Sequence, residues 1–236
     1  MEKEKPTSME FLDCICKDCD LKNLFFEHVK KDEMQRVCSM NTQHAFKKGD
    51  IISREGDDIK NFTYLKSGLV KLFRSDGEKE QIIHIAKPFD YVSILSLFSQ
   101  TKYQYSVTAL EDSVTCNLEM SFVTEMAEKN SVFALDLMRR MSEISDKIIM
   151  EMLEIRKRNL RGRVSFMLLY FAHDIFGGNS FELPVSRKEI AEYIGMSTEN
   201  VIRTLSEFRK DKIIKIFGKI IEIVDNEGLE RISRLG

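Results

Sequence analysis

Residues 185–214 read VSRKEIAEYIGMSTENVIRTLSEFRKDKII and contain the signals for two short helices separated by a tight turn. Ser186 and Glu189 have the spacing of a capping box, so a helix is expected to begin directly after Ser186. Gly195 can adopt the left-handed conformation that a tight turn requires, and Ser197 is a favoured cap for a second helix. The stretch therefore predicts the helix-turn-helix arrangement.

The second predicted helix has a buried face and an exposed face. Val201, Leu205 and Phe208 recur at spacings of four and three, which is typical of a side that packs inward. The other face carries residue types that can hydrogen-bond to base edges in a DNA major groove, with Arg pairing to guanine and Glu to cytosine. The predicted DNA-binding residues of this helix are Ser197, Thr198, Glu199, Ile202, Arg203 and Ser206. The alternative to a DNA-binding helix-turn-helix is a generic helical hairpin whose outer face is only solvated.

Two apolar strands are predicted after these helices. Residues 213–225, IIKIFGKIIEIVD, are interrupted by Gly218, as in a β-hairpin. A hairpin that follows a helix-turn-helix is the wing of a winged helix. Lys215 and Lys219 lie where such a wing could contact phosphate groups, and they complete the predicted DNA-binding set.

The region from Phe46 to Cys116 is strand-like. β-Branched and aromatic residues alternate with polar ones, and turn signals separate the runs, including the hairpin dipeptide Asp76-Gly77. Short strands at regular spacing indicate an antiparallel barrel or sandwich.

From Met120 to Arg158 the sequence contains no Gly or Pro, which predicts one long helix or two abutting helices. Its apolar residues recur at spacings of three and four and would suit a coiled coil with a second copy of the chain. The predicted dimer residues are Leu137, Met141, Ile144, Ile148, Met152 and Ile155. Packing of this helix on its own barrel is the alternative. The basic run RKRNLRGR, residues 156–163, is interpreted as a hinge and a solvated helix end.

The charge balance, the apolar runs and the absence of catalytic motifs argue against several classes of protein. Lysine and arginine number 36 against 38 acidic residues, so any DNA affinity would depend on local placement and on two-fold avidity. No apolar run approaches the roughly 18 residues of a membrane span, and the start MEKEKPTSMEF lacks a signal-peptide core, so no membrane partner and a cytoplasmic location are expected. The motifs G-x-S-x-G, H-E-x-x-H, G-x-G-x-x-G and the P-loop are absent, so an enzyme is not expected.

The order of barrel, long helix and winged helix resembles the cyclic-AMP receptor/fumarate-nitrate regulator (CRP/FNR) family of bacterial transcription factors. The similarity runs from Phe46 to Leu235 and depends on KKGDIISREGD (47–57), LKSGLVKLFRSDGEKEQI (65–82) and SRKEIAEYIGMSTENVIRTL (186–205). It implies an α+β chain with a cyclic-nucleotide-binding-like antiparallel β-barrel (jelly roll), a long dimerisation helix and a C-terminal winged helix-turn-helix. The predicted boundaries are 1–24 for a cysteine-containing arm, 25–130 for the barrel sensor, 131–160 for the helix and hinge, and 161–236 for the DNA-binding domain.

The resemblance also implies a function and a set of recognition positions. It implies a homodimer that binds a palindromic promoter site in double-stranded DNA and regulates transcription through RNA polymerase. The family's recognition positions correspond to Thr198, Glu199, Ile202 and Arg203. Glu199 and Arg203 match the family pattern, whereas Ile202 departs from the small or polar residue often found there.

The barrel departs from the members that bind cyclic nucleotides. Those members carry a Gly-Glu pair and an Arg-Ser pair, and the matching positions here are Ser93-Ile94 and Tyr105-Ser106. These four residues mark the predicted effector pocket. Because a bound phosphate would lack its arginine partner, cyclic AMP is not the expected effector, and the effector stays unknown.

The cysteines raise a separate question. Oxygen-sensing members of the family hold an iron-sulfur cluster with N-terminal cysteines and one barrel cysteine. Cys16 and Cys19 match part of that pattern and Cys116 falls at the barrel position, but Phe25 replaces the third N-terminal ligand. Cys14 could supply a fourth thiolate. Zinc bound by the same cysteines, or no metal at all, are the alternatives.

Three functional hypotheses follow from the sequence. The first is a sequence-specific DNA-binding regulator with a barrel sensor, and the second adds an iron-sulfur or thiol redox sensor of the fumarate-nitrate type. The third is a cyclic-nucleotide-fold dimer that binds a small molecule without reading bases.

Cys38, in a mixed helical stretch, is expected to be only a small buried or half-buried side chain.

Overall fold

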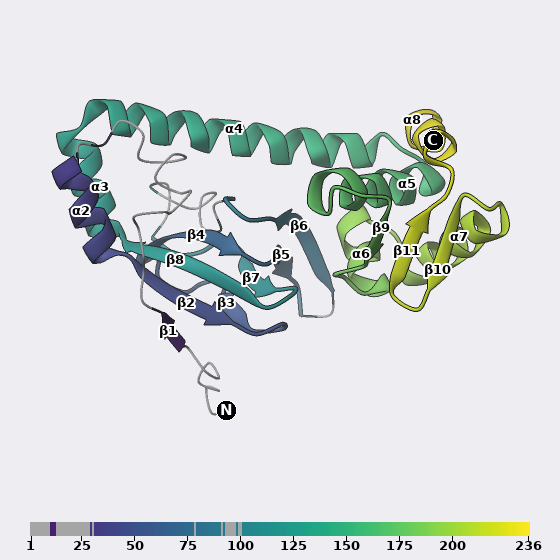
Figure 1. Cartoon of the computed structure of the whole chain (residues 1–236), viewed down its shortest axis with the longest axis horizontal. Helices are drawn as coiled ribbons and strands as arrows, with labels where there is room; N and C mark the ends of the chain where they lie inside the picture. Colours follow the sequence, from purple (N-terminus) through teal and green to yellow (C-terminus); the bar gives the residue numbers. More distant parts are fainter. Residues whose placement is uncertain are drawn as a thin grey trace. The chain divides into compact units, whose positions relative to one another are not determined.

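The computed structural model describes residues 10–12, 29, 31–77, 79–90, 92, 98 and 101–236. Contacts divide the chain into two compact units, one formed by Met1–Arg74 with His84–Lys147 and the other by Ser75–Ile83 with Ile148–Gly236. The division falls between Lys147 and Ile148. This point lies inside the long helix α4 (Ser131–Arg156), which is labelled in Figure 1. In the described part of the chain, no helix combines the length and the apolarity needed to cross a membrane.

Two antiparallel four-stranded sheets form the β-sandwich (Figure 1). The first has the order β1-β2-β8-β4, with β1 at Glu10–Leu12, β2 at Thr42–Phe46, β8 at Ser113–Glu119 and β4 at Asn61–Ser67. The second has the order β3-β7-β5-β6, with β3 at Ile51–Ser53, β7 at Ser106–Ala109, β5 at Val70–Ser75 and β6 at Glu80–Ala86. Gly77 lies between β5 and β6 with a φ of 97°, in agreement with the turn predicted at this dipeptide.

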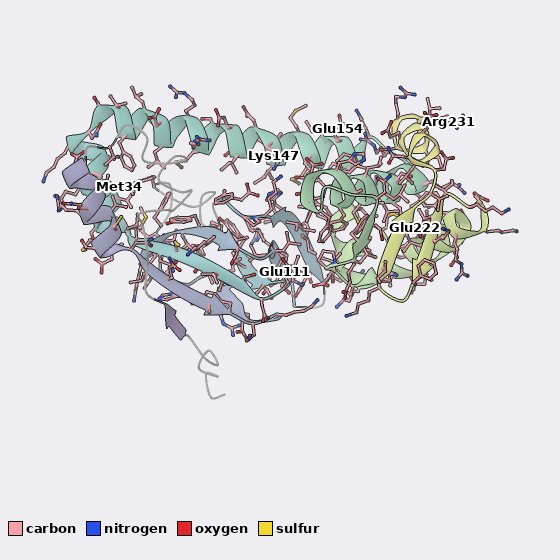
Figure 2. The ribbon with its side chains drawn as sticks, in the orientation of Figure 1. Met34, Glu111, Lys147, Glu154, Glu222 and Arg231 are labelled. Carbon is pink, nitrogen blue, oxygen red and sulfur yellow. The ribbon has the colours of Figure 1, made fainter. Side chains whose placement is uncertain are left out.

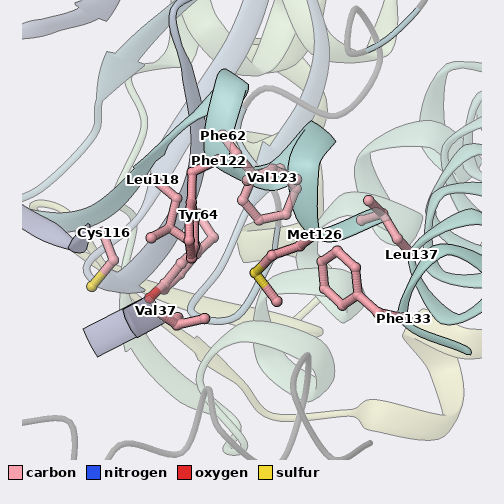
Figure 3. Packing of buried hydrophobic residues seen from close by; sticks show 10 residues of the cluster. All are labelled: Val37, Phe62, Tyr64, Cys116, Leu118, Phe122, Val123, Met126, Phe133 and Leu137. Carbon is pink, nitrogen blue, oxygen red and sulfur yellow. The ribbon is translucent and has the colours of Figure 1, made fainter. Parts of the chain in front are cut away.

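One face of the first sheet is covered by helices. Strand residues on this face pack against α2 (Lys31–Met40), α3 (Met120–Lys129) and the beginning of α4. The buried cluster, drawn in Figure 3, consists of Val37, Phe62, Tyr64, Cys116, Leu118, Phe122, Val123, Met126, Phe133 and Leu137. The opposite face of the same strands carries Thr63 and Asn117, which pair across β4 and β8. This alternation is the period of two that a β-strand imposes on its side chains.

The helical region after the sandwich is broken once. Asn130 has an extended backbone between α3 and α4, and its Oδ1 accepts a hydrogen bond from the backbone N–H of Phe133 at 3.1 Å. Asparagine is a strong N-cap because its side chain satisfies one of the free N–H groups of the first turn. Of the two predicted alternatives, one long helix or two abutting helices, the structure has the second.

The second unit contains the predicted winged helix. Its elements are α5 (Leu160–Tyr170), a π-helical turn η3 (Phe171–Ile175), β9 (Ser180–Glu182), α6 (Arg187–Ile194), α7 (Thr198–Lys210), β10 (Ile214–Phe217), β11 (Ile220–Ile223) and α8 (Asn226–Leu235). The strands form a sheet of order β10-β11-β9. Phe171, Ile190, Val201 and Phe208 are fully buried in its core. The predicted fold class, with sandwich, long helix and C-terminal winged helix-turn-helix, is confirmed.

Candidate nucleic-acid interface

The helix-turn-helix forms at the predicted residues. The backbone N–H of Ser186 donates to the Glu189 carboxylate at 2.8 Å, and the N–H of Glu189 donates to the Ser186 hydroxyl oxygen at 3.2 Å, which is the capping box. Gly195 ends α6 with a φ of 67°, and the Ser197 side chain accepts from the N–H of Asn200 at 3.3 Å to cap α7. Local sequence signals therefore determine the residue at which α7 begins.

Helix α7 has one buried face and one exposed face, as the periodicity of its apolar residues indicates. Val201, Leu205 and Phe208 are buried, together with Thr204. The opposite side presents Glu199, Ile202, Arg203 and Ser206 to solvent, with Ile202 half exposed at 50%. Thr198 is partly exposed at the first position of the helix. The predicted recognition residues thus lie on one accessible face.

The charged groups of this face are available for hydrogen bonding to bases. The guanidinium of Arg203 donates to Asn200 Oδ1 at 2.9 Å and lies 4.0 Å from a carboxylate oxygen of Glu207, while its side chain stays 64% exposed. The Glu199 carboxylate accepts from its own backbone N–H and from the Ser197 hydroxyl, which lowers the pKa of this carboxyl. It is therefore ionised at neutral pH, where it acts only as an acceptor.

The wing has one paired lysine. Lys215 lies opposite Glu222 in the β10–β11 pair, and its Nζ is 2.9 Å from the Glu222 carboxylate. Figure 2 labels Glu222 on β11. Lys219 lies exposed beside Gly218, whose φ of 64° forms the turn. Lys219 is therefore the predicted wing residue best placed to contact a phosphate group.

The basic run 156–163, which extends into α5, makes contacts within its own unit that the sequence interpretation missed. Arg161 pairs with Glu207 at 3.0 Å and with Asp211 at 2.9 Å, at the C-terminal end of α7. Arg158 Nε donates to the carbonyl oxygen of Ser233 in α8 at 2.8 Å. Arg158, whose side chain is only 10% exposed, thus packs against α8, and the interpretation as a solvated helix end is wrong for this residue. Arg161 is 38% exposed and forms surface ion pairs with α7. Asn159, which caps α5, is the sequence signal that a packed helix follows.

The predicted dimer residues of α4 lie against their own chain. Leu137 belongs to the buried sandwich cluster, with Met141 and Ile144 packed against it. Ile148 and Ile155 are 4% and 5% exposed, and Met152 is half-buried. A different apolar set is exposed on α4, and it comprises Val132, Leu135, Met138, Ile149, Met150 and Leu153. The helix thus has two apolar sides, and its own chain covers the side that the sequence assigned to a partner.

The structure describes two of the four predicted effector-pocket residues. Ser93 and Ile94 lie outside the described residues. Tyr105 is buried and its hydroxyl donates to the carbonyl oxygen of Val92 at 3.2 Å, while the Ser106 hydroxyl accepts from the N–H of Glu55 at 3.0 Å. Both described residues therefore make contacts within the sandwich itself.

A cavity of about 220 Å³ lies elsewhere in the sandwich. It is lined by His44, Phe46, Ile52, Ser53, Asp57, Asp58, Lys60, Asn61, Thr63, Val92, Tyr103 and Asn117. Thr63 donates to Asn117 Oδ1 at 2.7 Å, and burial lowers the pKa of His44. The lining carries Asp57, Asp58 and Lys60, and Asp58 is paired with Lys102. Among the described lining residues there is no arginine, so the cavity lacks the guanidinium that would pair with a phosphate group.

Only part of the predicted metal set can be placed. Cys14, Cys16, Cys19 and Phe25 lie outside the described residues. Cys116 is fully buried on β8, in the cluster of Figure 3 and opposite Tyr64 on β4. Cys38 is half-buried on α2, as expected. Where the structure is described, no three His, Cys, Asp or Glu side chains come together as metal ligands would.

Comparisons with known proteins agree with this architecture. A family model described as a cyclic nucleotide-binding domain matches residues 43–130, and one described as a Crp-like helix-turn-helix domain matches residues 162–232. The transcriptional activator protein FnrA of Stutzerimonas stutzeri is 29% identical over 222 residues, which cover 91% of this chain and 90% of that protein. The fumarate and nitrate reduction regulatory protein of Escherichia coli K12 is 25% identical over 229 residues, with coverage of 92% and 90%.

Solved structures support the fold. FixK2 from Bradyrhizobium japonicum superposes with a TM-score of 0.73 at 20% identity, covering 82% of this chain and 97% of the other. The fold and the exposed face of α7 define a DNA-binding transcription regulator that carries a cyclic-nucleotide-binding-like domain. The chain belongs to the CRP/FNR family, as its sequence resemblance predicted.

Proposed function

We propose that the protein binds a two-fold symmetric promoter site as a homodimer and regulates transcription through RNA polymerase. The observation that carries this proposal is the exposed face of α7, on which Glu199 and Arg203 lie about one turn apart on a capped helix. Relatives that are named transcriptional activators support activation as one mode of regulation. The protein would act in the cytoplasm by binding rather than by catalysis.

The exposed apolar side of α4 is the proposed dimer surface. Leu135, Met138 and Ile149 have 60%, 62% and 54% of their surface exposed, which is unusual for large apolar side chains on one helix. Burying such a face against a second copy removes apolar area from water and brings two recognition helices together. We therefore assign the dimer contact to this side rather than to the buried side that contains Leu137.

Selection from a pool of random double-stranded DNA tests the proposed function. The full chain should recover two inverted half-sites whose centres lie one helical turn apart, about 10–10.5 bp, or a multiple of that distance. Affinity for the recovered duplex should exceed affinity for a scrambled duplex by about 10³-fold or more. A recovered pool without any consensus would contradict base reading and favour the small-molecule-binding dimer.

Redox sensing through the cysteines is a second candidate function. The relatives named as fumarate and nitrate regulators favour it, and four cysteine thiolates suit an iron-sulfur cluster or tetrahedral zinc. The apolar cluster around Cys116 would keep solvent away from that ligand. When bound, a cluster would supply sensitivity to oxidants. The cavity chemistry disfavours cyclic AMP as effector.

Anaerobic purification tests the redox proposal. The wild-type protein should be coloured and contain iron and sulfide, whereas Cys14→Ser and Cys116→Ser should be colourless because four ligands are required. Cys38→Ser is the matched control and should keep the cluster. Zinc without iron would favour a structural site, and a colourless, metal-free wild type that still binds DNA would contradict metal binding altogether.

A further inference from the structure

A buried hydrogen bond joins α4 to the first helix of the helix-turn-helix. The hydroxyl of Tyr193, on α6, donates to the carboxylate of Glu151, on α4, and both residues lie in the second unit. Their exposed fractions are 7% and 9%. Burial and the nearby charge of Glu151 raise the pKa of Tyr193 well above its usual value, so the phenol keeps its proton and remains the donor.

A second contact reaches the same place. Arg163 Nη1 donates to the carbonyl oxygens of Ile194 at 3.1 Å and Gly195 at 3.2 Å, which lie at the turn after α6. The same guanidinium donates through Nε to the carbonyl oxygen of Arg158 at 2.9 Å. It therefore connects the turn to the segment that directly follows α4. Tyr193 and the two carbonyl groups are consecutive in the chain, so both contacts act on the end of α6.

The position of the end of α6 in space determines the position of the start of α7, because the connection between them is short. Gly195 forms the turn and Ser197 caps α7, so only a short segment separates Tyr193 from the recognition residues. On α4, Glu151 is buried, while its neighbours Met150 and Leu153 are 55% and 51% exposed on the proposed dimer surface. The same part of α4 thus holds the helix-turn-helix on one side and presents the dimer surface on another.

We propose that Glu151 and Tyr193 are positioning residues for DNA recognition. Their hydrogen bond fixes the end of α6, and with it α7, on the helix that forms the dimer, so that dimerisation sets the distance between the two recognition helices. Arg163 supports the same arrangement through the backbone of the turn. The inference rests on the proposed function, because it concerns how two half-sites are read together.

Substitution of Tyr193 by phenylalanine tests the pair. Tyr193→Phe keeps the ring and removes only the hydroxyl, so the core stays filled. The duplexes to compare contain one half-site, two half-sites with the selected spacer, and two half-sites with the spacer one base pair shorter or longer. Wild type should bind the duplex with the selected spacer more tightly than the duplexes with altered spacers. In Tyr193→Phe this ratio of affinities should fall about tenfold, since a hydrogen bond to a charged group is of this strength. Its affinity for the single half-site should stay unchanged.

Glu151→Gln is the conservative variant. The glutamine amide oxygen can still accept from the Tyr193 hydroxyl, so this variant should keep its spacer preference within about threefold of wild type. Amide hydrogen exchange of residues 195–201 in the DNA-free protein should become faster in Tyr193→Phe and remain near wild type in Glu151→Gln.

The possible outcomes separate the inference from the function on which it rests. If Tyr193→Phe bound every duplex more weakly by the same factor, or kept the spacer preference of wild type, the pair would only stabilise the fold. Either result would overturn the inference. A wild-type protein without preference for the selected half-sites would overturn the proposed function instead, and the inference with it. Faster exchange together with a lost spacer preference supports the positioning role.

Discussion

The double variant Glu199→Ala, Arg203→Ala is expected to bind its selected duplex about 10²- to 10⁴-fold more weakly than the wild type, since each good contact to a base edge contributes about 1–3 kcal/mol of discrimination. Both side chains lie exposed on α7, so their removal leaves the buried side of the helix intact. The substitution removes one acidic and one basic group and keeps the net charge. Affinity for scrambled DNA, which depends on phosphate contacts, should therefore remain near the wild-type value.

Fluorescence anisotropy with selected and scrambled duplexes at several salt concentrations measures this effect. The matched control is Glu230→Ala, Arg231→Ala, which removes an exposed pair of the same residue types from α8 in the same unit. Figure 2 labels Arg231 on that helix. The control should keep both affinities. Full retention of selected-duplex binding by the α7 variant would contradict base reading by this face.

Leu135→Glu should convert the proposed dimer into monomers and thereby reduce DNA affinity by about 10²- to 10⁴-fold, because the two half-sites would no longer be bound as a linked pair. Leu135 is 60% exposed on α4, so the substitution leaves the core of the monomer intact. A carboxylate buried between two copies would cost several kcal/mol unless it found a partner. Analytical ultracentrifugation over a range of concentrations measures the change in mass.

Two further leucines decide which side of α4 makes the contact. Leu235→Glu, at a residue 77% exposed on α8, is the matched control and should remain dimeric. Leu137 is 6% exposed in the sandwich cluster, so Leu137→Ala should lower the free energy of unfolding by about 2–5 kcal/mol and leave the dimer assembled when folded. A dimeric Leu135→Glu together with a monomeric, stably folded Leu137→Ala would return the interface to the side predicted from periodicity.

The sequence predicted best those elements whose signals are local. The capping box at Ser186, the turn at Gly195, the cap at Ser197 and the hairpin around Gly218 each depend on a few neighbouring residues, and each appears where it was expected. Because these signals agree with the apolar spacing of α7, the exposed recognition face followed from them. The division of α7 into a buried and an exposed face was therefore predictable residue by residue.

Contacts between distant residues were not predictable in the same way. Helix α4 is apolar on more than one side, and only the strands and helices that meet Leu137 decide which side is buried. The partner of Tyr193 could not be predicted, since nothing near it in the chain indicates Glu151. The carbonyl partners of Arg163 likewise depend on the fold, because any residue carries a carbonyl group.

The internal use of basic residues has a consequence for how the protein binds arbitrary DNA. Arg158 and Arg161 of the hinge and Lys215 of the wing already bind carbonyl or carboxylate groups of the same chain, and the net charge is −2. These three side chains are thus less available for phosphate contacts, so binding to arbitrary DNA would depend on other exposed basic residues of the same unit, such as Arg209 and Lys210 at the end of α7. Fewer phosphate contacts release fewer counterions, so binding to arbitrary DNA would depend less steeply on salt concentration than it would with these three side chains available.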